Sequence, residues 1–244
     1  MAMTSVMPAA EALDLVEAAT LAGAGVRLLG GQAVAYHCRG RVPAPLDRTS
    51  ADIDLFVRGR DRAGLQRVLA QHGWEGEREF NLLNGRTRLL YHKDGTKLDV
   101  FVDRFRMCHE WPLADRLPLC PVTLPPADLL LTKLQVVEIN RKDLTDSAAL
   151  LLRFPLGPDP AAAIDPAYLA ARLAVDWGLW RTVTGNLRHL QTLAGELPDP
   201  EAGRLRTALE ALAAAAAAAP KSPGWRLRSL LGDRVPWYER PEEP

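Results

Sequence analysis

The motif Asp52-Ile53-Asp54, at the start of an apolar run, most constrains how this chain can fold. Aspartate is depleted in strands, and residues two apart in a strand point to the same face. Asp52 and Asp54 would therefore project from one face of a strand. Ile53, Leu55 and Val57 would enter the core from the other face. Because carboxylates held close together repel each other unless a cation or a proton joins them, the pair predicts a divalent-cation site on a buried strand.

A Gly-Gly turn, Gly30-Gly31, lies upstream of this motif. It follows the apolar residues 26–29 and precedes residues 32–39, which are predicted to form a short helix. The start of a helix offers free N–H groups and a positive dipole end, which can bind a phosphate. Two adjacent glycines are by themselves typical of an ordinary tight turn. Their combination with Asp52 and Asp54 favours a phosphate site beside a cation site.

Together these motifs resemble the nucleotidyltransferases of the DNA polymerase beta-like superfamily. Members join a Gly-Gly or Gly-Ser turn that opens a helix to a strand bearing Asp-x-Asp. Arg48 and Thr49 precede the pair, as in many minimal members of the superfamily. The resemblance implies a third carboxylate on a later strand, and Asp99, within residues 97–102, fits that position. Asp103 is the alternative, because it lies on the same face if the strand continues.

The resemblance also implies a reaction. An acceptor hydroxyl would attack the α-phosphate of a nucleoside triphosphate such as ATP, with release of pyrophosphate and with Mg²⁺ or Mn²⁺ as the metal. Asp52 and Asp54 would hold both ions, and Asp99 would hold the catalytic ion and help to deprotonate the acceptor. Gly30, Gly31 and the backbone that follows them would bind the β- and γ-phosphates.

Two basic residues are candidates for further phosphate contacts. Arg48 lies in the predicted loop of residues 40–50, and a guanidinium group matches phosphate oxygens. Lys133 lies in the apolar part of a predicted amphipathic helix over residues 126–139, where it could either extend to solvent or reach a phosphate. The spacing from Lys133 to Asp143 and Asp146 resembles the abortive-infection toxin nucleotidyltransferases, which implies a toxin–antitoxin-like role. For Asp143 and Asp146 the structural explanation is favoured, as the N-cap and first-turn acid of the next helix.

The remaining patterns predict an α+β fold. Asn84-Gly85 and Asp94-Gly95 lie between strand-forming stretches, which predicts a meander with strands at residues 80–83, 87–92 and 97–102. Helices are predicted at residues 8–22 and 62–72. We therefore expect a small mixed β-sheet nucleotidyltransferase core with helices on one side, followed by a helical C-terminal domain. A Pro-Ala-Gly segment at residues 155–166 predicts the boundary between a catalytic domain, 1–154, and the helical domain, 155–244.

Composition narrows the class of protein further. The 244 residues are 48% hydrophobic with zero formal net charge, without the basic excess of a general nucleic-acid coater. Cys38, Cys108 and Cys120 lack the number and spacing of a disulfide framework or a zinc site. No targeting segment or membrane-spanning run is recognisable, so a cytoplasmic location without membrane contact is expected.

The motifs leave the acceptor open among RNA, a small molecule and a protein side chain. They also leave a rival of another class, a catalytically silent protein of the same fold that acts as an interaction or toxin-like module. An Asp-x-Asp phosphohydrolase is disfavoured, because Asp52 opens the strand where that group usually places its pair at the strand's C-terminal end.

Overall fold

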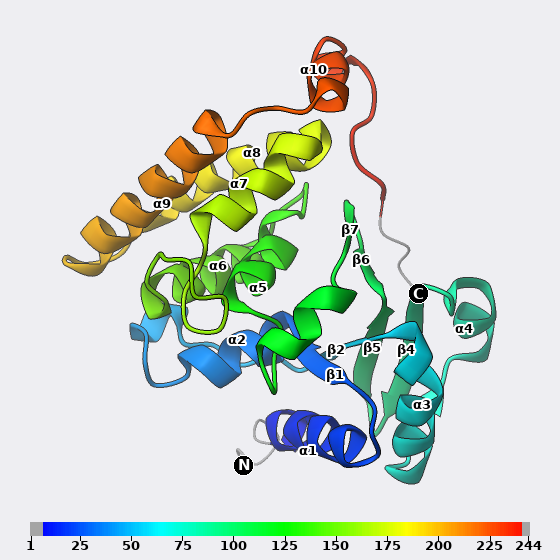
Figure 1. Ribbon diagram of the computed structural model, residues 1–244. Coiled ribbons are helices and arrows are strands. Elements are labelled where there is room, and N and C mark those ends of the chain that lie inside the picture. The colour runs from blue at the N-terminus through cyan, green and yellow to red at the C-terminus, as the bar shows by residue number, and fades with distance from the viewer. Residues whose placement is uncertain (1–6, 241–244) are drawn as a thin grey trace.

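A five-stranded mixed sheet forms the centre of the N-terminal part in the computed structural model, which describes residues 7–240. Strands β2 and β5 are parallel, and the other neighbours are antiparallel. In spatial order the strands are β1 (Val26–Leu29), β2 (Ile53–Val57), β5 (Thr96–Val102), β4 (Arg88–Lys93) and β3 (Glu75–Gly76). The predicted α+β class with a mixed sheet is confirmed (Figure 1).

The two faces of this sheet differ in what covers them. Helices α1 (Met7–Leu21) and α3 (Arg62–Gln71) lie along the face that buries Ile53, Leu55 and Val57 (Figure 1). Glu11 of α1 pairs with Lys93 of β4 at 2.5 Å, and Gln66 of α3 donates to the Tyr91 hydroxyl at 3.3 Å. Since side chains alternate along a strand, Asp54 and Asp99 project from the opposite face.

The predicted meander is half right. Asp94-Gly95 forms the tight turn between β4 and β5, with positive φ at both residues (48° and 76°), as a type I′ hairpin requires. The predicted strand at residues 80–83 is wrong, because this stretch lies within helix α4 (Arg78–Asn84), and Asn84-Gly85 is the helix end rather than a hairpin. The Asn81 amide accepts from Leu90 N at 2.6 Å and donates to Leu90 O at 2.9 Å. The Asn81 side chain thus forms the backbone hydrogen bonds of Leu90 that a neighbouring strand would otherwise form.

Three helices that border the site differ at their ends from the prediction. Helix α2 (Gly30–Cys38) begins at the first glycine, not after the pair, and α5 (Pro126–Leu134) stops short of residue 139. Helix α6 (Arg141–Arg153) is capped by the Asn140 side chain, which accepts from Asp143 N at 3.0 Å. Asp143 is therefore not the N-cap, because Asn140 fills that position and Asp143 lies within the first turn.

The rest of the chain is mostly helical and lies at the end of the molecule opposite α1 and α3 (Figure 1). The Asn186 amide donates to Leu134 O and Val136 O at 2.8 and 2.7 Å, which holds α8 against the end of α5. None of the helices within residues 7–240 is both long enough and apolar enough to cross a bilayer. The helices at this end are α7 (Pro166–Val175), α8 (Trp177–Ala194), α9 (Glu201–Ala218) and α10 (Pro223–Ser229). Elsewhere the chain forms the hairpin β6 (Arg104–Arg106) and β7 (Glu110–Pro112) and the 3₁₀ turns Ala44–Leu46, Gly59–Asp61, Ala114–Leu119 and Gly232–Arg234.

Candidate functional site

Asp54 and Asp99 are directly aligned partners on the parallel strands β2 and β5. Their side chains share one sheet face, and Asp99 is buried while Asp54 is half-buried. Burial, followed by the charges of Asp99 and Asp52, raises the pKa of the Asp54 carboxyl to about 7 against the opposing charge of Lys133. The aligned pair therefore concentrates negative charge that a proton or a cation would neutralise.

The start of helix α2 lies directly against Asp54. Gly30 has a φ of +65°, and a Cβ at this position would lie 1.8 Å from Asp54 Oδ2. A Cβ at Gly31 would lie 2.5 Å from Ser50 Oγ. A larger residue at either position would therefore clash with Asp54 or Ser50. The N-cap residue, Leu29, provides no side-chain hydrogen bond to the helix start. The backbone N–H groups at this helix start therefore lie beside the carboxylate, where an anion bridged by a cation could bind.

Asp52 does not share the strand with Asp54. It is exposed and lies in the bend just before β2, so the two aspartates are not neighbouring positions of one strand face as expected. Within residues 7–240, no three His, Cys, Asp or Glu side chains converge as a preformed metal cluster. Magnesium is usually held by one or two carboxylates together with substrate phosphates, and Asp54 with Asp99 fits that donor set. A metal site on Asp52, Asp54 and Asp99 remains a prediction.

Two cations on Asp99 were missed by the sequence analysis. Arg88 Nε donates to Asp99 Oδ1 at 2.8 Å, and Lys97 Nζ lies 3.3 Å from Oδ2. Lys97 is two residues from Asp99 and so on the same face. Arg88 could have been found from the turn, since the register set by Asp94-Gly95 places it diagonally across from Asp99.

Arg48 and Lys133 meet at the same buried carboxylate. Arg48 donates to both oxygens of Asp146, at 2.6 and 2.5 Å, and Lys133 Nζ lies 3.0 Å from Asp146 and 2.9 Å from Asp143. Burial lowers the pKa of Lys133, but the carboxylates of Asp146 and Asp143 outweigh it and leave the pKa above its usual value. Lys133 is therefore a charged group held inside the protein near Asp54, and it does not extend to solvent. Asp146 connects the two predicted phosphate ligands.

The other expected alternative, Asp103, has a different place. It lies beyond the end of β5 with a φ of 58°, and its Oδ1 accepts from Gly59 N at 2.8 Å. This contact joins the ends of β5 and β2, which is a structural role.

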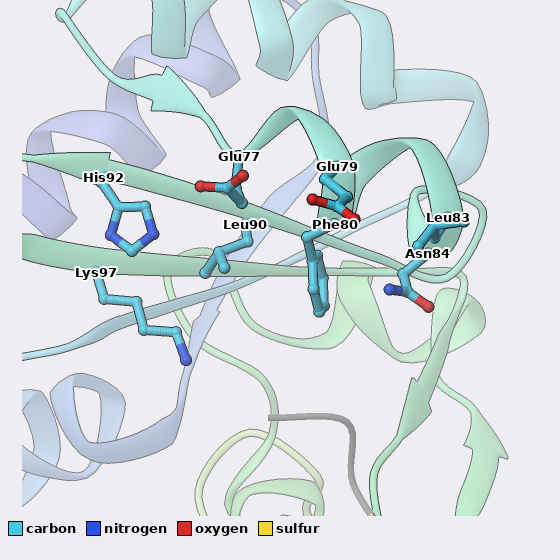
Figure 2. Close-up of a pocket in the computed structure, with 8 residues that line it drawn as sticks. All are labelled: Glu77, Glu79, Phe80, Leu83, Asn84, Leu90, His92 and Lys97. Carbon is cyan, nitrogen blue, oxygen red and sulfur yellow. The ribbon is translucent and has the colours of Figure 1, made fainter. Parts of the chain in front are cut away.

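A groove of about 760 Å³ adjoins Asp99 on the same sheet face (Figure 2). Strands β4 and β5 form its floor, and helix α4 forms a wall. Its lining residues are Glu77, Glu79, Phe80, Leu83, Asn84, Leu90, His92 and Lys97.

No model of a known protein family matches the chain, and neither does any curated protein. Among solved structures it is similar to an antigenic nucleotidyltransferase-like protein from Paracoccidioides brasiliensis, with 16% identity, a TM-score of 0.43, and coverage of 83% of this chain and 92% of that one. It is also similar to the antibiotic-resistance factor ANT(2'')-Ia, with 14% identity, a TM-score of 0.35, and coverage of 92% and 96%.

Proposed function

We propose that the protein transfers a nucleoside monophosphate from a nucleoside triphosphate to an acceptor hydroxyl. The observation that carries the proposal is the alignment of Asp54 with Asp99 on neighbouring parallel strands, directly against the start of α2 at Gly30. Paired carboxylates beside free helix N–H groups suit a triphosphate that arrives with its own cation.

In the proposed reaction, the acceptor oxygen bonds to the α-phosphorus. The bond from the α-phosphorus to the oxygen that bridges to the β-phosphate breaks, and pyrophosphate leaves. Asp99 would accept the proton of the acceptor hydroxyl, because it lies between Asp54 and the open groove. The N–H groups at Gly30 and Gly31 would hold the β- and γ-phosphates in line for departure.

The basic residues would stabilise charge on the triphosphate. Arg48 keeps a partly exposed guanidinium while bound to Asp146, and Lys133 places a fixed positive charge near Asp54. Because Asp146 holds both cations, little reorganisation would be needed when the phosphates bind.

Asp54 and Asp99 would hold Mg²⁺ or Mn²⁺, with Asp52 as a further oxygen donor from the bend. When bound, the metal supplies charge stabilisation for the attacking and leaving oxygens. The chain's own contribution is to hold the carboxylates on rigid, paired strands.

The test separates the two carboxylates by role. Asp54→Asn should abolish magnesium-dependent triphosphate binding, measured by calorimetry. Asp99→Asn should retain that binding within about threefold and lose at least ~10²-fold in the rate of label transfer from a labelled triphosphate to cell-extract fractions, the lower end of a general-base contribution. Asp103→Asn is the matched control, since asparagine keeps the oxygen that accepts from Gly59 N, and both measurements should match the wild type. If Asp99→Asn transfers label normally, the assignment of Asp99 is wrong.

A second function, a silent interaction module of the same fold, is favoured by one observation. Both oxygens of Asp99 already have cationic partners, Arg88 and Lys97, which a metal ion would have to share or displace. The calorimetry decides between the two, because a silent module would not bind a triphosphate in a magnesium-dependent way.

A further inference from the structure

The groove beside Asp99 is placed to receive the second reactant of the proposed reaction. Leu90 is the aligned partner of Asp99, and His92 is the aligned partner of Lys97, so the floor of the groove continues the sheet face that bears the carboxylates. Figure 2 shows Leu90 between His92 and Phe80, with Glu77 and Glu79 along the α4 side. A volume of about 760 Å³ is within the range of small-molecule sites.

The charge of the groove favours a cationic ligand. Glu77 and Glu79 are exposed, and neither has an ion-pair partner within residues 7–240. Lys97, the lysine of the groove, lies 3.3 Å from Asp99, which also pairs with Arg88, so the two charges of Glu77 and Glu79 exceed the one positive charge that remains. This excess of negative charge would attract ammonium groups and repel a phosphate backbone.

The remaining lining favours a ring that carries hydroxyls. Phe80, Leu83 and Leu90 offer apolar surface, and Asn84 and His92 offer hydrogen-bonding groups beside it. A saturated ring with an apolar face and hydroxyl edges uses both kinds of surface. The Phe80 ring is already approached by the Arg88 guanidinium at 5.4 Å, which makes it a poor platform for stacked bases.

We infer that this groove is the acceptor site and that it binds a small hydroxylated molecule bearing primary ammonium groups. Glu77 and Glu79 bind the ammonium groups, the apolar wall contacts the ring, and one hydroxyl faces Asp99. This inference rests on the proposed nucleotidyl transfer and specifies its acceptor.

The test uses a matched pair of probes, the disaccharide of glucosamine and its di-N-acetyl counterpart. The two share their hydroxyls, and acetylation removes the positive charge while adding an acetyl group to each nitrogen, so the variants below isolate the charge effect. By calorimetry without nucleotide, the free-amine disaccharide should bind the wild type at least ~10-fold more tightly. Glu77→Gln/Glu79→Gln should remove that preference and leave magnesium-dependent ATP binding unchanged. Glu201→Gln/Glu210→Gln, which removes two charges from the distant helix α9, should keep the preference.

Equal affinity for the two disaccharides, or a preference that survives in the double variant, would overturn the inference. So would a short single-stranded RNA that binds more tightly than the free-amine disaccharide and competes with it, which would assign the groove to nucleic acid. If ATP binds with magnesium but the free-amine disaccharide does not, only this inference fails. If the free-amine disaccharide binds and ATP does not, the proposed function fails and the acceptor role fails with it.

Discussion

At the scale of single residues, the site depends on the absence of a side chain at Gly30. A methyl group there would lie 1.8 Å from Asp54 Oδ2, and the backbone has a positive φ of 65°. Helix α2 can start against the carboxylate only because glycine meets both conditions. The positions of the Asp54 carboxylate and of the α2 start therefore both depend on glycine at residue 30.

Gly30→Ala should weaken magnesium-dependent triphosphate binding by at least ~10-fold, because Asp54 must move away from the new methyl group. Gly23→Ala is the matched control: Gly23 has a φ of +78°, and a Cβ there would meet nothing within 4 Å. Both variants should lose about 1–2 kcal/mol of unfolding free energy from the strained φ. Only Gly30→Ala should also lose binding in calorimetry, and equal binding by the two variants would contradict the close-approach argument.

Asp54 should also leave a signature in the pH dependence of stability. Burial raises the pKa of its carboxyl from 3.8 to about 7, so between these values the folded state binds more protons than the unfolded state. The unfolding free energy contributed by this group therefore falls as pH rises through that window. Without added metal, urea unfolding at about pH 5 and about pH 8 should show wild type losing stability relative to Asp54→Asn at the higher pH. A constant difference between the two proteins would show that Asp54 is not perturbed.

At the scale of elements, helix α4 decides the shape of the groove. The apolar character of residues 80–83 predicts a strand. In the structure, however, the Asn81 side-chain amide bonds the backbone of Leu90 at the edge of β4, where a further strand could have paired. The helix then stands against the sheet as a wall and leaves the groove open beside Asp99. A regular strand at this edge would have extended the sheet without making a wall.

Asn81→Ala should loosen the contact of α4 with strand β4. The Leu90 N–H would lose its partner, at a cost of about 1–3 kcal/mol in unfolding free energy. Hydrogen exchange should become faster in α4 and at Leu90, while β2 and β5 keep their protection. The Asn84 side chain, on the same helix, makes no hydrogen bond within residues 7–240, so Asn84→Ala should change the unfolding free energy by no more than about 0.5 kcal/mol and leave exchange unchanged. Unchanged exchange in Asn81→Ala would mean that packing alone holds α4.

At the scale of the whole molecule, the buried apolar cluster continues through residues 155–166, since Ile164 is fully buried and belongs to it. Beyond this segment, the Arg204 guanidinium donates to Leu152 O at 2.9 Å, and Asn186 holds the end of α5. We therefore propose that residues 155–166 are the site at which a protease separates domains 1–154 and 155–244. The buried side chains of the two domains still pack against each other.

Limited proteolysis should first cut the exposed tip at residues 158–162, where the backbone has few regular partners. Because the cluster spans the segment, the two fragments should remain together in size-exclusion chromatography under native conditions and separate in denaturant. A first cut elsewhere would contradict the proposed boundary.

Sequence alone determined the features that depend on near neighbours. The alternation of residues 53–57, the Asp94-Gly95 turn and the first helix follow from periodicity and turn chemistry, which act within a few residues. The register of β4 and β5 follows from that turn, so even the contact of Arg88 with Asp99 was within reach of local reasoning.

Tertiary structure decided what depends on partners far along the chain. The alignment of Asp54 with Asp99 comes from a parallel pairing whose register no local turn sets. Arg48 meets Asp146 across 98 residues, and neither position carries a local signal of the other. The apolar residues 80–83 fit either a strand or a helix, and the Asn81 contact with β4 selected the helix. Local propensity cannot fix such choices, because their free energy comes from burial and hydrogen bonds that exist only once distant segments have packed.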